Sequence, residues 1–132
     1  NKMLHFPGGI VGFPELQDFA LIHDAEDGKD SSIHWLQSVQ EPNFAMPVID
    51  PLRVRPDYNP EADDELLSTI GEINPDELLV LVTITVPSDL TKMTVNLMAP
   101  FVINVATRKA CQVIVDGYEI KFPIYDILQK MK

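Results

Sequence analysis

The chain has 132 residues, which predicts one domain over residues 1–132, and 45% of them are hydrophobic, enough to bury a core. Twenty acidic residues against ten basic ones give a formal charge of −10, which argues against nucleic-acid binding through phosphate neutralisation and against docking on an anionic membrane surface. The one cysteine, Cys111, excludes an internal disulfide and any paired-cysteine zinc site.

The first part of the chain predicts short strands separated by turns. Phe19–His23 and Ile33–Val39 are apolar segments of strand length, and the polar stretch 24–32 between them is typical of a hairpin loop. Phe44–Asp50 predicts a third strand. Because Pro47 inside that strand has no N–H to donate, we expect an edge strand or a bulge there.

One helix is predicted over Asn59–Gly71, an acidic segment with start and stop signals. Asn59 can act as N-cap, and Pro60 suits the first helical position because its missing N–H costs nothing there. Gly71 can end the helix in the left-handed conformation. The next residues, Asn74-Pro75-Asp76-Glu77, repeat the start signal, so we expect a single helical turn.

The rest of the chain predicts a central strand, further short strands and a final helix. Leu78–Val86 is apolar on one face and half apolar on the other, which is typical of a strand covered on both sides. Three further strands are predicted: Met93–Ala99, Phe101–Val105 and Ala110–Val115. Asp116-Gly117 predicts a hairpin turn. The apolar spacing of Phe122–Met131 predicts a helix that begins at Pro123.

These elements together favour a mainly β fold. We expect a small antiparallel sheet that closes or nearly closes into a barrel or sandwich, with one or two short helices. The longest apolar stretch is interrupted by Thr83 and Thr85, and no stretch has the roughly 20 apolar residues that a membrane-spanning helix needs.

The charge is unevenly distributed along the chain. Residues 1–78 carry 16 acids and 4 bases, whereas residues 79–132 carry 4 acids and 6 bases. Two interpretations remain open at this point. The negative charge can serve solubility alone, or it can form an acidic face suited to a basic partner.

No catalytic or metal-binding motif emerges from the residues. The three histidines, His5, His23 and His34, have neither HExxH nor HxH spacing, so a zinc site would need all three to converge in space. Cys111 lies in an apolar stretch, which favours an inert packed thiol over a nucleophile. We interpret Trp35 as a core anchor rather than a platform for sugar stacking.

Several motifs follow one another in order along the chain. The earlier ones are Gly12–Ile22 (GFPELQDFALI), Trp35–Val39 (WLQSV), Val48–Pro51 (VIDP), a proline-flanked acidic helix and Glu77–Pro87 (ELLVLVTITVP). The most specific are Met93–Asn104 (MTVNLMAPFVIN) and Thr107–Val115 (TRKACQVIV). This series resembles the FliW family of flagellar assembly factors over about residues 9–115. Cys111 departs from the pattern, because a small or basic residue is expected there.

The resemblance implies a small cytoplasmic regulator with a barrel-like β fold, which is not an enzyme and needs no cofactor. Members of the family bind flagellin, the filament subunit, as chaperones. They also bind the RNA-binding translational repressor CsrA and so stop it from repressing flagellin translation, while newly made flagellin competes for the regulator. We expect a monomer with these two protein partners.

Two other classes of function stay open on the residues alone. A hydrolytic barrel that uses carboxylates requires two close-set, buried carboxylates in a deep pocket. A ligand-binding barrel requires a large apolar cavity. A protein-binding regulator requires an exposed apolar patch beside acidic residues.

The first candidate partner-binding residues are acidic. Asp63, Asp64 and Glu65 lie near the start of the predicted helix. They can attract a basic partner, or they can act only locally by stabilising the positive end of the helix dipole.

The other candidates lie in the second half of the chain. Within Met93–Ala99 we expect Val95 and Leu97 to be buried, so that Thr94 and Asn96 face outward or line a groove. Asn96 can instead bond nearby backbone and shape a turn. Asn104 is a further candidate, and the turn that follows it carries Arg108, which can contact flagellin or form an ion pair with a nearby acid.

Overall fold

The computed structural model describes residues 2–23 and 33–130, and these residues form mainly strands, which confirms the predicted fold class. The described strands are β1 (Lys2–His5), β2 (Asp18–His23), β3 (Ile33–Ser38), β4 (Ala45–Ile49), β5 (Leu78–Thr85), β6 (Thr94–Val95), β7 (Phe101–Asn104), β8 (Lys109–Gln112) and β9 (Phe122–Pro123). The described helices are α1 (Asp64–Ser68), α2 (Tyr125–Lys130) and the single 3-10 turns η1 (Pro51–Arg53), η2 (Pro75–Glu77) and η3 (Leu90–Lys92).

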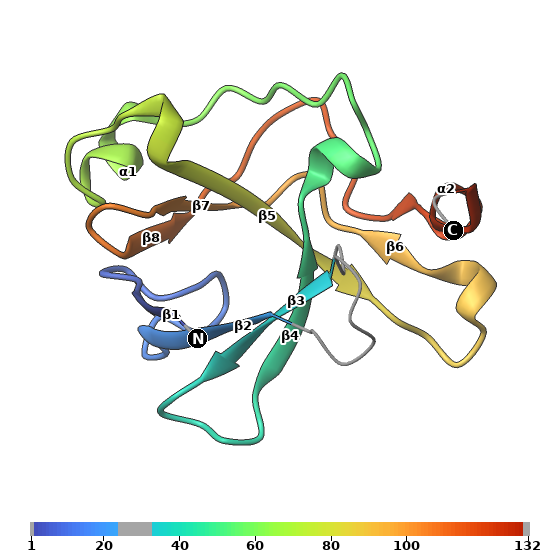
Figure 1. Cartoon of the computed structure of the whole chain (residues 1–132), viewed down its shortest axis with the longest axis horizontal. Helices are drawn as coiled ribbons and strands as arrows, with labels where there is room; N and C mark the ends of the chain where they lie inside the picture. The colour runs from blue at the N-terminus through green and yellow to red at the C-terminus, as the bar shows by residue number, and fades with distance from the viewer. Residues whose placement is uncertain (1, 24–32, 131–132) are drawn as a thin grey trace.

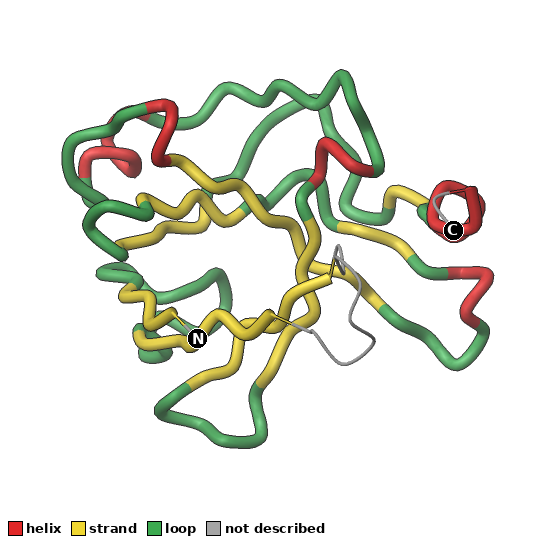
Figure 2. Tube along the Cα trace, viewed as in Figure 1, coloured by secondary structure: helices red, strands yellow, loops and turns green. Residues whose placement is uncertain are grey.

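Seven of these strands close into a barrel (Figure 1, Figure 2). Neighbouring strands pair in the order β4-β3-β2-β1-β8-β7-β5, and β5 pairs again with β4, which completes the ring. The pairings are antiparallel except at one seam, where β1 runs parallel to β8 through the single residue pair His5 and Lys109. The predicted antiparallel barrel is therefore confirmed for all but this seam.

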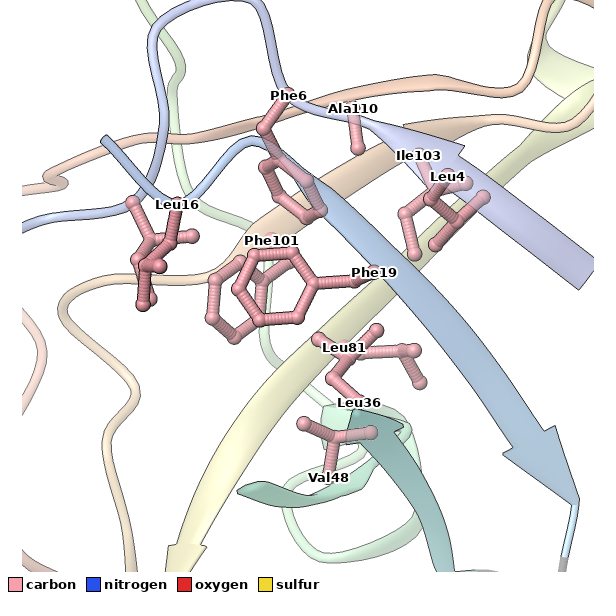
Figure 3. Close-up of a cluster of buried hydrophobic side chains, with 11 residues drawn as sticks. Leu4, Phe6, Leu16, Phe19, Leu36, Val48, Leu81, Phe101, Ile103 and Ala110 are labelled. Carbon is pink, nitrogen blue, oxygen red and sulfur yellow. The ribbon is translucent and has the colours of Figure 1, made fainter. Parts of the chain in front are cut away.

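The barrel interior is filled by apolar side chains (Figure 3). Every one of the seven strands contributes to this cluster, with Leu4, Phe19, Leu36, Val48, Leu81, Phe101, Ile103 and Ala110. Phe6 packs edge-on against Phe19 and Phe101, with ring centroids 5.4 and 5.7 Å apart. The interior is thus a packed core.

Two further apolar clusters lie on the outside of the barrel. One contains Val82 of β5 together with Tyr58 from the connection that follows β4. The other contains Val102 of β7 together with Ile70, which follows α1. Because Leu81 faces the interior and Val82 the outer cluster, β5 is buried on both faces near its middle, as predicted for a central strand.

Helix α1 is shorter than predicted and begins at Asp64 rather than at Pro60. Asp63 is its N-cap and accepts a hydrogen bond from the backbone N–H of Glu65 at 2.8 Å. The residues before it are not helical, and Asn59 N–H donates to the Tyr118 hydroxyl at 3.0 Å, which attaches this segment to the C-terminal part of the chain. The helix also ends earlier than predicted, at Ser68 with Thr69 as its C-cap, although Gly71 does adopt a left-handed φ of +91° three residues further on.

The predicted strand Met93–Ala99 is wrong in length. Only Thr94–Val95 pairs as β6, between β5 and β9, because the Asn96 side chain accepts a hydrogen bond from Met98 N–H at 3.0 Å and bends the chain. The predicted burial of Val95 and Leu97 is confirmed, since both are fully buried.

The C-terminal helix also begins later than predicted. Phe122–Pro123 forms β9, because Phe122 pairs with Val95, and α2 starts only at Tyr125. The predicted end at Met131 lies outside the described residues. Within those residues, no helix combines the length and hydrophobicity needed to cross a membrane.

Two predictions about β3 and β4 are wrong. Strand β4 is not an edge strand, because its last residues pair with β5; Pro47 lies just before that pairing begins, where a missing N–H is tolerated. Trp35 is not a core anchor. Side chains alternate along β3, and Leu36 occupies the interior, so Trp35 points outward and is 39% exposed.

The two predicted hairpins have different outcomes. β2 and β3 pair antiparallel as the first requires, although its loop over residues 24–32 lies outside the described residues. The turn at Asp116–Gly117 forms, with a φ of +84° at Gly117, but it does not join two paired strands. Its flanks bond instead to the segment after β6: Val115 N–H donates to Met98 at 2.8 Å, and Leu97 N–H donates to Glu119 at 2.9 Å.

Candidate functional site

An apolar groove of about 370 Å³ lies on the outer side of the barrel. It is covered by residues 50–67, which we call the arch and which pass over β5 and β7 in the upper part of Figure 1. Strand residues that line the groove are Leu78, Leu79, Val80 and Val102. Arch residues that line it are Asp50, Pro51, Leu52, Tyr58, Asn59, Pro60, Ala62 and Leu67. The groove can accept an apolar side chain from a partner.

A buried hydrogen bond anchors the middle of the arch. The Tyr58 hydroxyl, which is buried, donates to the backbone carbonyl of Leu97 at 2.6 Å. Burial raises the pKa of Tyr58 to about 12, and nearby Tyr118 adds to this, while Arg55 acts in the opposite direction. Tyr58 therefore keeps its proton at neutral pH and remains a donor.

A second anchor joins the arch to the C-terminal part of the chain. The Arg55 guanidinium lies 4.9 Å from the Tyr118 ring centroid and 5.5 Å from that of Phe122. It also pairs with Glu119 at 3.0 Å and with Asp57 at 3.3 Å. This stacking restricts the arch on the side away from α1, so the groove has a built wall rather than a loose loop.

The acidic candidates Asp63, Asp64 and Glu65 lie at the rim of the groove, and all three are exposed. Ala62 and Leu67, which flank them along the chain, both line the groove. Residues 50–77, which include the arch, contain nine acidic and two basic residues. The structure therefore places an apolar groove beside a strongly negative segment.

Asn104 holds the end of α1 against the barrel. Its amide nitrogen donates to the carbonyls of Ile70 and Glu72, both at 3.0 Å, and Thr107 Oγ1 donates to Ile70 at 2.8 Å. The Asn104 side chain is 1% exposed, so it has no surface to offer a partner. The contacts give this residue a structural role, and the partner contact predicted for it stays a prediction.

Arg108 lies in the turn that Asn104 ties to α1 (Figure 1). It is exposed, with a φ of +60°, and its backbone bonds to Asn104 at 2.8 Å and to His5 at 2.9 Å. No acid among the described residues forms an ion pair with its guanidinium. The side chain is thus available to a partner at the same end of the molecule as the acidic residues.

Thr94 and Asn96 lie elsewhere. Strand β6 extends from β5 on the side of the molecule opposite to α1 in Figure 1. The Asn96 side chain bonds nearby backbone and shapes a turn, which was the alternative to a partner contact. Thr94 and Asn96 are both half-buried. The structure therefore brings the acidic residues and Arg108 to one region and leaves these two apart.

The described residues offer little for metal binding. The Nδ1 atom of His5 lies 2.8 Å from Asp18 on the exposed outer surface, and His23 is the register partner of His34. No group of three or more metal-ligating side chains occurs among the residues described. Cys111 is buried, and burial raises the pKa of its thiol, as expected of a packed cysteine.

Sequence reasoning missed the arch residues that line the groove. Leu52, Tyr58 and Pro60 lie in the connection between β4 and α1, for which the sequence predicted only a helix start. The available signal was the presence of apolar residues between closely spaced prolines in an otherwise acidic, irregular segment. Turns hold such apolar residues in place, so they are expected to pack over another part of the same molecule.

Comparison with known proteins identifies the family. A family model described as FliW protein matches residues 1–124, which extends beyond the predicted 9–115. The flagellar assembly factor FliW of Lachnoclostridium phytofermentans is 46% identical over 98% of this chain and 84% of its own length. That of Lachnospira eligens is 43% identical over 98% of this chain and 88% of its own.

A solved structure agrees in fold. The crystal structure of a flagellar assembly factor FliW superposes with a TM-score of 0.79 and 30% sequence identity, covering 92% of this chain and 82% of that one. Sequence and fold therefore lead to the same family, and the chain belongs to the FliW family, whose named members are flagellar assembly factors.

Proposed function

We propose that this protein is a cytoplasmic flagellar assembly factor that binds two protein partners and is not an enzyme. One partner is flagellin, which it holds as a chaperone. The other is a CsrA-type RNA-binding repressor, whose repression of flagellin translation is relieved by the binding. Membership of the FliW family supports the general role.

The observation that carries the proposal is the apolar groove beside the acidic segment. A protein that holds RNA phosphates presents a basic surface, and such a surface is attracted by a segment with nine acids and two bases. Charge speeds encounter and selects the partner, whereas the groove supplies desolvated contact area. The repressor is therefore assigned to the arch and α1.

Flagellin is assigned to a contact that includes Arg108. This side chain is exposed and without an ion pair among the described residues, so it can meet an acidic or polar patch without first breaking an internal contact. Because Asn104 and Thr107 tie its turn to α1, the two contacts are neighbours. Neighbouring contacts give competition between the partners a simple physical basis.

The test compares matched variants in binding to purified repressor and purified flagellin. Leu52 lines the groove and is 52% exposed, whereas Leu90 of η3 is 54% exposed and lies outside it. Leu52→Gln is expected to weaken repressor binding about tenfold, roughly the loss of one anchored apolar side chain, while Leu90→Gln leaves it unchanged. Equal effects of the two variants would remove the groove from the proposal.

The flagellin arm uses a charge reversal with its own control. Arg108→Glu is expected to weaken flagellin capture without lowering the melting temperature, because the side chain has no internal ion pair to lose. Lys121→Glu makes the same charge change near β9, where Lys121 is also exposed. If both variants capture flagellin as the unmodified protein does, Arg108 is not part of the contact.

Light scattering during chromatography tests the proposed monomer.

A further inference from the structure

A second hollow, of about 390 Å³, lies away from the arch. Two connections form it, residues 6–17 between β1 and β2 and residues 39–44 between β3 and β4, the second of which is the loop at the bottom of Figure 1. We call it the aromatic hollow, and its lining residues are Phe13, Glu15, Leu16, Gln40, Glu41 and Phe44. Neither the groove nor the proposed partner contacts include any of these residues.

The aromatic wall of the hollow is continuous with the core. Phe13 packs edge-on against Phe44 with centroids 5.0 Å apart, and Phe44 lies 6.3 Å from Phe19, which packs against Phe6 in the interior. Phe13 is the outermost ring of this series and is 43% exposed. Phe13 therefore contacts Phe44 on its inner side and presents the rest of its ring to solvent.

The two connections are tied together by side-chain amides. Gln40 Oε1 accepts from Gln17 N–H at 2.7 Å and from Asp18 N–H at 3.0 Å, and its Nε2 donates to Glu15 at 2.8 Å. Gly9 allows the first connection to close: a side chain there would lie 2.3 Å from the Pro14 carbonyl oxygen. The hollow is therefore formed in advance of any binding.

The rim of the hollow carries negative charge that nothing nearby neutralises. Glu15 and Glu41 are both exposed, and neither forms an ion pair with a described residue. No lysine or arginine occurs among the described residues 6–23 and 33–52. Glu41 Oε1 accepts a long bond from Asn43 N–H at 3.4 Å, which leaves its negative charge in place. An exposed ring and two carboxylates lining one hollow are complementary to a cation with a flat face.

We infer that the aromatic hollow binds an arginine side chain of a partner protein. A guanidinium can stack on the Phe13 ring while its N–H groups donate to the carboxylates of Glu15 and Glu41. The compact, strongly hydrated ammonium of lysine gains less from a ring and from paired carboxylates, so arginine is preferred. The inference does not depend on which partner occupies the groove under the arch.

The test is an NMR titration of the 15N-labelled full chain with the peptide acetyl-Gly-Arg-Gly-amide. The matched probe carries citrulline, which has the shape of arginine and no charge. The arginine peptide is expected to shift the backbone amide signals of Gln40, Glu41 and Phe44 saturably, and the citrulline peptide is not. A third peptide, with lysine in place of arginine, is expected to bind about threefold more weakly than the arginine peptide.

Two variants separate ring from charge. Phe13→Leu is expected to weaken binding about threefold, and the double change Glu15→Gln and Glu41→Gln to weaken it at least as much. The control, Glu61→Gln with Glu72→Gln, removes the same charge from the segment around α1. Equal shifts with citrulline, arginine shifts centred on α1, or a control that weakens binding as much as the double variant would each overturn the inference.

Discussion

Replacing Asn104 with alanine removes the joint between the end of α1 and the turn that carries Arg108. The lost contacts are two donated hydrogen bonds of 3.0 Å, to Ile70 and Glu72, one accepted from Ala106 N–H at 3.0 Å and a longer one accepted from Thr107 N–H at 3.4 Å. The Ile70 carbonyl keeps its bond from Thr107 Oγ1 at 2.8 Å, but the other three backbone groups lose the Asn104 side chain.

The expected cost follows from these contacts. Each lost hydrogen bond contributes about 1 kcal/mol, and leaving a buried polar group without a partner costs about 1–3 kcal/mol. Some of the backbone groups become accessible to water, so the sum is about 3 kcal/mol. For a chain of 132 residues each kcal/mol lowers the melting temperature by about 3–5 °C, which predicts a fall of about 9–15 °C.

The assay is urea and thermal unfolding followed by circular dichroism, with Asn96→Ala as the control. That variant makes the same chemical change at a half-buried residue whose amide oxygen accepts one bond, from Met98 N–H at 3.0 Å, so about 1 kcal/mol is expected. A role as partner contact predicts instead that Asn104→Ala unfolds normally and binds weakly. Equal stability losses in the two variants would refute the structural reasoning.

The remaining predictions concern charge, pH and thiol reactivity. Replacing Asp63, Asp64 and Glu65 with lysine is expected to slow association with the repressor. The association rate of the unmodified protein should also fall with added salt, because the Debye length shortens from about 10 Å at 0.1 M to about 3 Å at 1 M. Association rates that are the same for both proteins and do not change with salt in stopped-flow mixing would contradict this. Asp63→Ala alone should also cost about 0.5–2 kcal/mol of stability, as the loss of an N-cap, with Asp63→Asn costing less in the same urea titration. Because the pKa of Tyr58 is raised to about 12 from 10.0, the folded chain keeps a proton that the unfolded chain loses above pH 10. The free energy of unfolding should therefore fall between pH 10 and 12, and more steeply than it does in the Tyr58→Phe variant. Cys111 should react with a thiol reagent only as fast as the protein opens, and a reaction at the rate of a free thiol would show that it is not packed as described.

Local signals in the sequence determined several elements directly. The η2 turn begins at Asn74, whose side chain accepts from Asp76 N–H at 3.1 Å, as its start signal predicts. Gly71 adopts the predicted positive φ, although α1 ends three residues before it, at Ser68. Strands with long apolar runs, such as β5, are also predicted correctly in place and in the burial of both faces. These features depend on interactions within a few residues, so the sequence is sufficient.

Element boundaries failed where a distant residue competed with the local signal. Asn59 and Pro60 have good helix-start chemistry, but Tyr58 and Asn59 are held by bonds to Leu97 and Tyr118, and the helix begins at the next good cap, Asp63. The strand predicted over Met93–Ala99 is interrupted because Asn96 bends the chain, and the bent segment is then held by bonds of Leu97 and Met98 with the flanks of the turn at Asp116. No local pattern contains these partners, which lie about twenty or more residues away.

In the candidate site, too, some features follow from the sequence and others depend on the tertiary structure. The acidity of residues 50–77 is a property of the sequence, and the helix that carries Asp64 and Glu65 follows from its cap. The groove does not follow from either, because its lining comes from the arch, from β5 and from β7, which only the closed barrel brings together. Likewise, Trp35 is exposed because barrel closure directs Leu36 inward. Composition sets charge and hydrophobicity, but register and chain crossing decide which of these residues share a surface.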